Sequence, residues 1–372
     1  MRSDRSGVVI IGGGVIGCAI AYYLARAGLR ATVLERGRIG GGASGAAAGM
    51  LAPLSEAHGP GPFFDLLMAS LQLYPELLAE LRDLAPDIDL EHQHIGVLRV
   101  ALDDADLAQL EKRYQWLQAG GGHSQWLSAS EALALEPGLS PGVRAAILSP
   151  AEQQLDPLRL TQALAKAAGR LGADLREGIA VSGFETSAGR VTGVRTSDGT
   201  LPAEHIVLAA GSWCGQVAAG LGATIPMRPV RGQLMSLTGL QPPLRHIIWG
   251  SRGYLAPKAG GSLWAGTTVE EAGFRPHTTV AGLRRIRSAA NRLVPGLRAA
   301  GTEASWAGLR PATPDGLPVL GSLPGWRNVS VAGGHFRNGI LLAPITGRIM
   351  AQLIADGRSE ADLTPYRTDR FS

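Results

Sequence analysis

Three glycines, Gly12, Gly14 and Gly17, follow the apolar run 8–11 in the pattern G-x-G-x-x-G. Gly12 permits a sharp turn at the end of a strand, Gly14 lets a phosphate approach the backbone without a Cβ in its way, and Gly17 lets a helix pack closely on a sheet. Glu35, eighteen residues beyond Gly17, can accept hydrogen bonds from ribose hydroxyls and would repel a 2′-phosphate. This spacing indicates a site for a dinucleotide other than NADP, and it does not separate FAD from NAD.

A second segment of small residues follows at 40–50 (GGGASGAAAGM). Because these side chains are short, the backbone can approach a large flat ligand closely, and the Ser44 hydroxyl can contact a pyrophosphate. A flexible loop is the alternative, but the segment ends on the apolar residues Met50 and Leu51 and holds no polar filler. We therefore expect it to line the cofactor, which favours FAD over NAD.

Alternating strands and helices must position these residues. An apolar strand at 8–11, a helix at 18–27 that ends at Gly28, and a strand at 31–34 form the β-α-β unit to which this glycine pattern belongs. Later segments predict a helix at 158–171, strands at 173–175, 190–196 and 204–209, and a dense run of strands and turns at 227–268. The chain is therefore predicted to be an α/β protein.

Length and composition set the outer limits. The 372 residues allow two domains, and 45% hydrophobic with 18% charged residues excludes general disorder. Cys18 and Cys214 are too few for a disulfide scaffold or a cysteine-based metal cluster. The histidines are dispersed, and the close pair His92 and His94 is more typical of a surface strand than of a metal site, so we predict no metal.

The charge pattern and the N-terminus bear on partners and location. The net charge is only +4, and the densest basic group, 284–287, is expected on the solvated face of an amphipathic helix. No basic run alternates with aromatic residues, so no nucleic-acid partner is expected. A polar lead at 1–7 is unlike a signal peptide, and glycines interrupt the apolar run 8–27, which argues against a membrane span. We expect a cytoplasmic protein that does not bind membranes.

Five segments, read together, resemble the D-amino-acid-oxidase-like family of FAD-dependent amine oxidoreductases. They are 9–17 with the glycine turn, SGAAAGML at 44–51, FFD at 63–65, WAGLRPATPDG at 306–316 and GHFRNGILLAP at 334–344. Within that family the chain is similar to the glycine oxidases of the thiamine pathway, and the likeness covers nearly the whole chain. The resemblance implies a Rossmann-like FAD-binding domain and a second, substrate-binding domain with a mixed or antiparallel sheet. The implied FAD-binding ranges are 1–85, 145–225 and 305–372, and the implied substrate-binding ranges are 86–144 and 226–304.

The resemblance also implies which residues hold FAD. A cysteine that could bind FAD covalently is absent from 310–314, so the cofactor is expected to be non-covalent. The expected contacts, including the glycine turn and Gly211 at the end of a predicted strand, are Gly12, Gly14, Val15, Ile16, Gly17, Glu35, Arg36, Ala43, Ser44, Ala48, Gly49, Met50, Val181, Gly211, His335, Phe336, Arg337, Asn338, Gly339, Ile340 and Leu341.

Three residues are expected to act on the substrate. By resemblance, Arg310 clamps the substrate carboxylate and the Tyr254 hydroxyl also contacts it, while Arg337 positions the substrate or its loop. A guanidinium suits this task because its planar fork meets a carboxylate with two hydrogen bonds. FAD carries the electrons, so the protein needs neither a nucleophile nor a metal, and no general base is named. The proline- and glycine-rich segment 51–62 is expected to cover the active site.

The implied activity is oxidative deamination of glycine and other small amines or D-amino acids, such as sarcosine, D-alanine and D-proline. A hydride passes from the substrate Cα to the flavin, and O₂ reoxidises the flavin and yields H₂O₂. Arg252 and Val269 stand where the glycine-oxidase pattern has histidine and methionine, which alters the expected side-chain preference. The family also suggests a homotetramer.

Three other functions stay open at this point. A flavin dehydrogenase could pass electrons to a quinone or a protein instead of O₂. An RNA-modification module would resemble the oxidase half of bifunctional tRNA-modifying enzymes, although no RNA-binding extension is seen. An NAD-dependent dehydrogenase would not explain the segments 44–51 and 334–344, which would then have no function.

Overall fold

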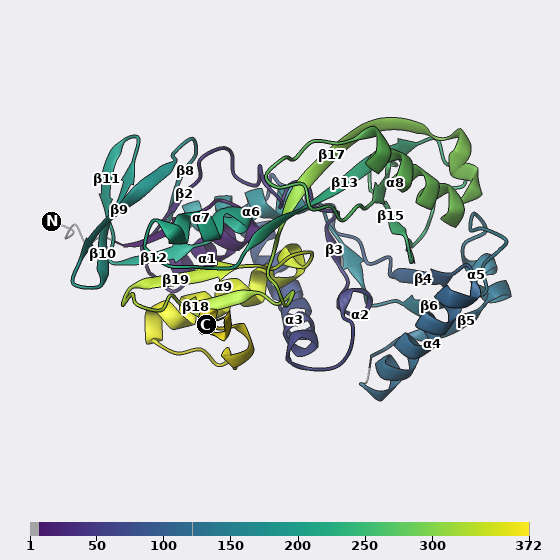
Figure 1. The fold of residues 1–372 in the computed structure, drawn as a ribbon. Helices are drawn as coiled ribbons and strands as arrows, with labels where there is room; N and C mark the ends of the chain where they lie inside the picture. Colours follow the sequence, from purple (N-terminus) through teal and green to yellow (C-terminus); the bar gives the residue numbers. More distant parts are fainter. Residues whose placement is uncertain (1–6, 121, 372) are drawn as a thin grey trace.

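A computed structural model describes residues 7–120 and 122–371 of the chain. Residues 1–6 of the polar lead, and with them the ends of the predicted FAD-binding ranges at residues 1–6 and 372, lie outside the described residues. Figure 1 shows an elongated molecule with a different sheet towards each end. The order of elements agrees with the predicted α/β class, with a parallel sheet in one part and a mixed sheet in the other.

A six-stranded sheet, in the order β18-β19-β12-β1-β2-β8, forms the first part. Its strands are parallel except β18, which runs antiparallel to β19. The strands are β1 (Val8–Ile11), β2 (Ala31–Leu34), β8 (Asp174–Arg176), β12 (His205–Leu208), β18 (Val319–Ser322) and β19 (Val329–Gly333). The predicted β-α-β unit is thus confirmed, with helix α1 (Val15–Arg26) beginning three residues earlier than expected.

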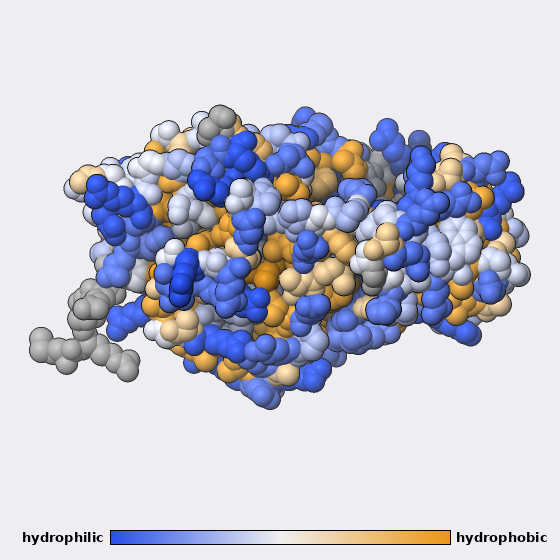
Figure 2. Space-filling view, turned by 90° about the horizontal axis from the view of Figure 1, so that it is seen from below, coloured by the Kyte–Doolittle hydropathy of each residue, from blue (hydrophilic) through white to orange (hydrophobic). Residues whose placement is uncertain are grey.

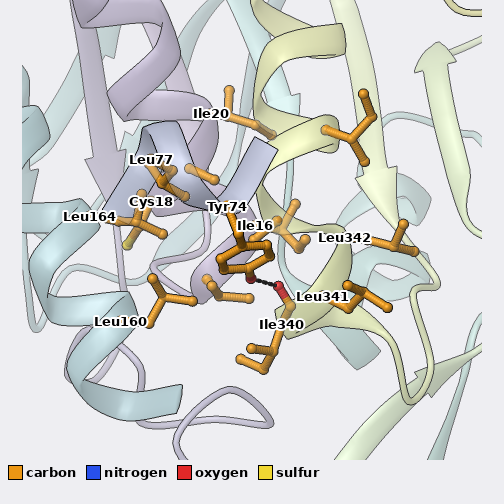
Figure 3. Close-up of a cluster of buried hydrophobic side chains, with 14 of the residues drawn as sticks. Ile16, Cys18, Ile20, Tyr74, Leu77, Leu160, Leu164, Ile340, Leu341 and Leu342 are labelled. Atoms are coloured by element: carbon orange, nitrogen blue, oxygen red, sulfur yellow. Dashed lines mark hydrogen bonds between the residues drawn. The ribbon is translucent and has the colours of Figure 1, made fainter. Parts of the chain in front are cut away.

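Four helices pack together beside this sheet. They are α1, α3 (Pro62–Leu84), α6 (Pro157–Arg170) and α9 (Gly339–Asp356). Figure 3 shows their contact, where Tyr74 of α3 donates a hydrogen bond to the carbonyl of Ile340 in α9 among buried side chains of α1 and α6. By length and composition alone α9 could cross a membrane, but 61% of its window is buried inside the protein. This burial identifies α9 as a core helix here.

A small antiparallel sheet covers part of the first domain. Its strands are β9 (Val181–Ser187), β10 (Arg190–Thr196) and β11 (Gly199–Pro202). Phe184, Val191 and Val194 of this sheet pack with Ile206 and Leu208 of β12 in one buried cluster. Strand β12 then leads through a 3-10 turn, Gly211–Trp213, into α7 (Cys214–Ala219).

An eight-stranded sheet forms the second part, in the order β17-β13-β16-β15-β14-β4-β6-β5. Its neighbours are antiparallel except β14 and β4, which run parallel. The strands are β4 (Val97–Ala101), β5 (Gln125–Ser128), β6 (Ala145–Ser149), β13 (Arg228–Thr238), β14 (Ile247–Gly250), β15 (Gly253–Pro257), β16 (Leu263–Gly266) and β17 (Gly301–Ala312). Strand β6 (Ala145–Ser149) pairs with β4 and β5 in this sheet, although the FAD-binding range 145–225 expected from the sequence begins at its first residue.

Different elements pack on the two faces of the eight-stranded sheet. Helix α8 (Val280–Leu293) packs on one face, where Ile286 and Leu293 join a buried cluster with Leu255 and Ala265. Thr279 caps the N-terminus of α8, where its side chain accepts a hydrogen bond from the backbone N–H of Gly282. Side chains of the other face, among them Trp249 and Tyr254, form a separate cluster with Ala48 of the first domain. This second face therefore meets the cofactor-binding part.

Two short elements lie between the two parts, namely α2 (Pro53–Glu56) and the two-stranded pair of β3 (Met50–Leu51) with β7 (Gln153–Gln154). Helices α4 (Asp104–Ala119) and α5 (Ala129–Leu135) pack on β4, β5 and β6 of the second part. Figure 1 shows α2 between α3 and the strands β4 and β6 of the second part. On the face drawn in Figure 2, polar side chains cover both ends and apolar residues gather near the middle.

Candidate active site

One large cavity, of about 900 Å³, runs between the two parts of the molecule. Residues at the carboxyl ends of β1 and β2, such as Gly12 and Glu35, line one side. Tyr254 of β15 and Arg310 of β17 line the other. Ligands of parallel α/β sheets bind at the carboxyl ends of the strands, and this cavity has that position.

Most of the residues predicted to hold FAD line this cavity. They are Gly12, Gly14, Val15, Ile16, Glu35, Arg36, Ala43, Ser44, Ala48, Gly49, Met50, Val181, Gly211, His335, Phe336, Arg337, Gly339 and Ile340. Chain segments more than 300 residues apart in the sequence thus meet around one space. Their contacts with FAD themselves stay predictions.

The other three predicted residues do not line the cavity. A Cβ on Gly17 would lie 1.9 Å from the carbonyl oxygen of Gly12, so Gly17 allows the close packing of α1 on its turn. Asn338 precedes α9, and its side-chain Oδ1 is buried without a hydrogen-bond partner. Leu341 is 1% exposed and packs in the core, where Figure 3 places it beside Leu342.

The ends of two helices make the cavity suitable for FAD. Gly14 precedes α1 and Asn338 precedes α9, and neither of these cap residues gives a side-chain hydrogen bond to its helix. Backbone N–H groups at a helix N-terminus attract negative charge. The start of α1 is therefore suited to the pyrophosphate, and the start of α9 to the electron-rich edge of the flavin. A Cβ on Gly14 would approach Ser44 Oγ to 3.2 Å, so the absence of a side chain at Gly14 leaves space between the start of α1 and Ser44.

The carboxylate of Glu35 accepts hydrogen bonds from the backbone on both sides of it, including the glycine turn at 12–17. Its Oε2 accepts a hydrogen bond from the N–H of Gly13, and its Oε1 accepts one from the N–H of Gly37, both at 2.8 Å. Ser44 Oγ likewise accepts a hydrogen bond from the N–H of Val15 at 2.9 Å. These side chains therefore hold the shape of the dinucleotide turn and also line the cavity.

Arg310 presents its guanidinium to the cavity from β17. Its Nη2 donates a hydrogen bond to Thr267 Oγ1 at 2.6 Å, and its Nη1 donates one to the carbonyl of Thr268 at 3.1 Å. Burial lowers the pKa of Arg310 from its ordinary value, but an arginine stays protonated. Within the part of the chain that the structure describes, no acidic side chain forms an ion pair with Arg310. A buried cation without a counter-ion favours an anionic ligand.

Gly232 fixes where that guanidinium lies. A Cβ at Gly232 would come within 2.0 Å of Arg310 Nη2. The register of β13 with β17 explains this contact, because Gly232 pairs with Gly308 and so lies diagonally next to Arg310. Only a glycine at this position leaves room for the guanidinium.

Tyr254 stands beside Arg310 in the same cavity. Its ring is 5% exposed and covers Gly266 of the neighbouring strand, where a Cβ would lie 2.6 Å from the hydroxyl oxygen. Burial raises the pKa of Tyr254, while the charges of Arg310 and Arg337 lower it. The hydroxyl is thus protonated near neutral pH and able to donate a hydrogen bond to an anion.

Arg337 is already paired. Its Nε and Nη2 donate hydrogen bonds to the two carboxylate oxygens of Glu56 at 3.0 and 3.1 Å. The charge of Glu56 raises the pKa of Arg337 above its ordinary value. Both side chains line the cavity, so a substrate would meet the ion pair instead of a free arginine. Glu56 was not predicted, although it lies in the segment 51–62 that was expected to cover the site.

Two further lining residues, Trp213 and Phe274, and one residue next to the cavity, Lys258, were not predicted either. Trp213 follows the predicted turn at Gly211. Its ring contacts Arg36, whose Cζ is 3.9 Å from the ring centroid, and Phe274, at 5.2 Å between centroids. Lys258 lies just outside the cavity, where its Nζ donates a hydrogen bond to the carbonyl of Ala48 at 2.6 Å. An aromatic residue after a strand-end glycine was the available signal for Trp213, whereas nothing local marks Phe274 or Lys258.

Metal-ligand side chains do not gather in groups of three or more anywhere in residues 7–120 and 122–371. His92 and His94 contact each other edge to face at 4.5 Å, and His92 Nε2 shares a hydrogen bond with Gln153 Oε1. Cys18 and Cys214 are both free and buried, and burial raises the pKa of both thiols above their ordinary value. Neither cysteine is a reactive thiolate at neutral pH.

One cavity thus joins a glycine turn of the dinucleotide-binding type, a buried arginine and a tyrosine, an arrangement that fits a two-domain flavin oxidoreductase. The chain matches the family described as FAD dependent oxidoreductase (DAO) over residues 7–353, and it belongs to that family. It is an FAD-dependent amino-acid oxidase similar to the glycine oxidases.

Individual relatives agree with this assignment. The glycine oxidase of Geobacillus kaustophilus is 37% identical over 371 residues, which cover 99% of this chain and 98% of the relative. A crystal structure of glycine oxidase from the same species superimposes with a TM-score of 0.94 at 35% identity, covering 98% of this chain and 99% of the other. The bifunctional protein ThiO/ThiG of Nostoc sp. is 36% identical over 98% of this chain, which spans 55% of that relative.

Proposed function

We propose that this protein oxidises glycine and other small amines or D-amino acids, including sarcosine, D-alanine and D-proline. With glycine or D-alanine the reaction consumes the amino acid, O₂ and water and gives the 2-oxo acid, ammonia and H₂O₂. Sarcosine releases methylamine in place of ammonia, and D-proline with O₂ gives its cyclic imine and H₂O₂. The observation that carries the proposal is the guanidinium of Arg310, which is buried, lacks an acidic partner among the described residues and faces the cofactor cavity.

In this account the protein binds and orients, and FAD does the redox chemistry. FAD held in the cavity would supply the redox chemistry, namely acceptance of a hydride from the substrate and transfer of the electrons to O₂. Arg310 receives the substrate carboxylate with two hydrogen bonds, and Tyr254 donates a third. The residues that fix Arg310, namely Gly232, Thr267 and Thr268, determine where the substrate Cα lies. Such positioning supplies a large part of the rate of a reaction between two bound groups.

The substrate amine reacts in its neutral form. No side chain is assigned as a general base, because the ammonium group can lose its proton to solvent before the substrate is enclosed. The ion pair of Glu56 with Arg337 forms another part of the cavity wall and restricts the space next to Tyr254. A small side chain on the substrate fits this arrangement.

The relative named ThiO/ThiG supports a place in thiamine biosynthesis, at the step that prepares the thiazole ring. The family resemblance further supports a cytoplasmic homotetramer. Light scattering of the purified protein tests the assembly, and a tetramer mass is the expected result.

Coupled measurements test the activity. The purified chain is expected to be yellow, to release FAD on denaturation, and to form H₂O₂ in proportion to the glycine consumed. The same protein without O₂ should have its flavin reduced by glycine. Flavin reduction without O₂ uptake would replace the oxidase by a dehydrogenase that uses a quinone or a protein acceptor. A protein that binds FAD but is reduced by none of the four substrates would refute the proposal.

A further inference from the structure

The ion pair of Glu56 with Arg337 depends on a very short helix. α2 consists of Pro53, Leu54, Ser55 and Glu56 only. A helix of four residues cannot be stable by itself, because the cost of starting a helix exceeds what one turn returns. Contacts with other elements must therefore hold Glu56 where it meets Arg337.

Those contacts come from a buried glutamate. Glu152, in the turn between β6 and β7, is 0% exposed, and Ser55 is 4% exposed. Glu152 Oε1 accepts a hydrogen bond from the N–H of Ser55 at 2.8 Å, and Oε2 accepts one from Ser55 Oγ at 2.5 Å. Burial raises the pKa of Glu152 to about 7, and the hydrogen bonds of Ser55 and the charge of Arg99 oppose that rise. A single carboxylate thus binds both donors of the residue next to Glu56.

Two arginines hold the carbonyl side of the same helix. Arg99 of β4 donates a hydrogen bond from Nη2 to the carbonyl of Ser55 at 2.7 Å. Arg113 of α4 donates one from Nη1 to the carbonyl of Leu54 at 2.7 Å. These are among the last carbonyls of α2, which the helix itself leaves unpaired. Side chains outside α2 therefore pair with an N–H group and with two carbonyl groups of this helix.

The network also reaches the wall of the cavity. Arg99 and Trp249 are paired across β4 and β14, and Arg99 Cζ lies 5.1 Å from the centroid of the Trp249 ring. Arg337 Cζ lies 5.5 Å from the same ring, whose centroid is 5.6 Å from that of Tyr254. Trp249 is thus in contact range of the anchoring network, of Arg337 and of Tyr254.

We propose that Glu152, together with Arg99 and Arg113, is a positioning residue that fixes the helix Pro53–Glu56, so that Glu56 holds Arg337 at the wall of the substrate pocket. This inference rests on the proposed function for its kinetic consequence. Without the anchor, α2 loses its fixed place and Arg337 is released from Glu56. The free guanidinium then no longer packs at a fixed place on Trp249, which contacts Tyr254, so the Tyr254 hydroxyl holds the carboxylate of a small substrate less well.

The test uses two buried glutamates of the same chain. In Glu152→Gln one of the two acceptors for Ser55 becomes a donor. The matched control is Glu136→Gln, because Glu136 is 2% exposed and accepts hydrogen bonds from the N–H groups of Arg245 and His246, away from α2. Both variants are made in the full chain loaded with FAD. Three measurements are made on each variant. They are hydrogen exchange of the peptide 50–62, the Kd of acetate from the change in flavin absorbance, and kcat and KM for glycine.

In Glu152→Gln we expect faster exchange of the 53–57 amides and a rise of about tenfold in the Kd of acetate and in KM, as for the loss of one hydrogen bond to a charged group. FAD content and kcat should change by less than about twofold, and Glu136→Gln should match the wild type in the peptide 50–62. In a protein that already carries Glu56→Gln, the further substitution Glu152→Gln should no longer change KM. If Glu152 only stabilised the fold, it would change KM in both backgrounds. If Glu152→Gln does not fold, Ser55→Ala removes one of the two hydrogen bonds and should show the same changes on a smaller scale.

Equal exchange, acetate Kd and KM in Glu152→Gln and Glu136→Gln would overturn the inference. Failure of the proposed function looks different, because the wild type would then bind FAD without being reduced by glycine. In that case the hydrogen exchange and the acetate Kd still decide whether Glu152 fixes α2.

Discussion

Replacing Gly232 by alanine tests the geometry at Arg310 without removing any functional group. The added Cβ would lie 2.0 Å from Nη2 and 2.3 Å from Cζ of Arg310, whereas real Cβ contacts stay beyond 3.0 Å. The guanidinium must therefore retreat by at least about 1 Å, because the strand backbone is held by the β13–β17 ladder. A displacement of this size in a group that orients the substrate costs about 100-fold in rate. We expect kcat/KM for glycine to fall by about that factor.

The assay is H₂O₂ formation over a range of glycine concentrations, with bound FAD measured in the same preparation. Gly260→Ala is the matched control, because a Cβ there has no neighbour within 4 Å and the residue lies in the turn that follows β15. FAD content should stay that of the wild type in both variants. A Gly232→Ala protein that is folded, loaded with FAD and as active as Gly260→Ala would show that the position of Arg310 does not control substrate binding.

Three further substitutions follow from the structure. Thr267→Val removes the acceptor of the 2.6 Å hydrogen bond from Arg310, and we expect KM for glycine to rise about five- to tenfold at unchanged FAD content; an unchanged KM contradicts this. Lys258→Met removes the hydrogen bond to the carbonyl of Ala48, and the Kd of FAD, followed by the fluorescence of released FAD, should rise about tenfold, whereas equal retention would exclude that role. Burial lowers the pKa of His205 to about 4, so the folded protein keeps this ring neutral and loses stability as the pH falls from 6.5 towards 4. His205→Gln should lessen the fall of Tm over that interval, and a Tm curve parallel to the wild type would refute this.

The cofactor half of the site was predictable because its signals are local. The turn at Gly12 and Gly14 follows directly after an apolar strand, and Glu35 closes the next strand within the same β-α-β unit. Residues so close in the sequence can adopt few arrangements other than the one observed. The small-residue segment 40–50 lines the cavity for the same reason, since β2 leads into it.

The substrate half depends on contacts between distant segments. Glu56 and Arg337 are 281 residues apart, and Arg310 and Thr267 are 43 residues apart. Gly232 reaches Arg310 only through the register of β13 with β17, and periodicity does not specify the register between two strands so far apart. Resemblance supplied Arg310 and Tyr254, but it did not supply the partners that fix them.

Helix α3 shows a limit of a different kind. It spans 23 residues and begins at Pro62, the last residue of the segment 59–62, which consists of glycine and proline, and it contains Pro75. These residues are typical of loops, and none of the helices predicted from the sequence covers this region. Burial against α9 overrides that local preference, because Tyr74 and Leu77 of α3 are nearly inaccessible in the core.

We propose above all that Arg310 holds the acid end of a small amine next to a non-covalently bound flavin. Anaerobic titration of the flavin absorbance with glycine tests it most directly, in the wild type and in Arg310→Ala, with ethylamine as a substrate analogue that has no carboxylate. We predict that Arg310→Ala keeps FAD and needs at least about 100-fold more glycine for half-reduction, while its response to ethylamine equals that of the wild type. Half-reduction of both proteins at the same glycine concentration would contradict the claim.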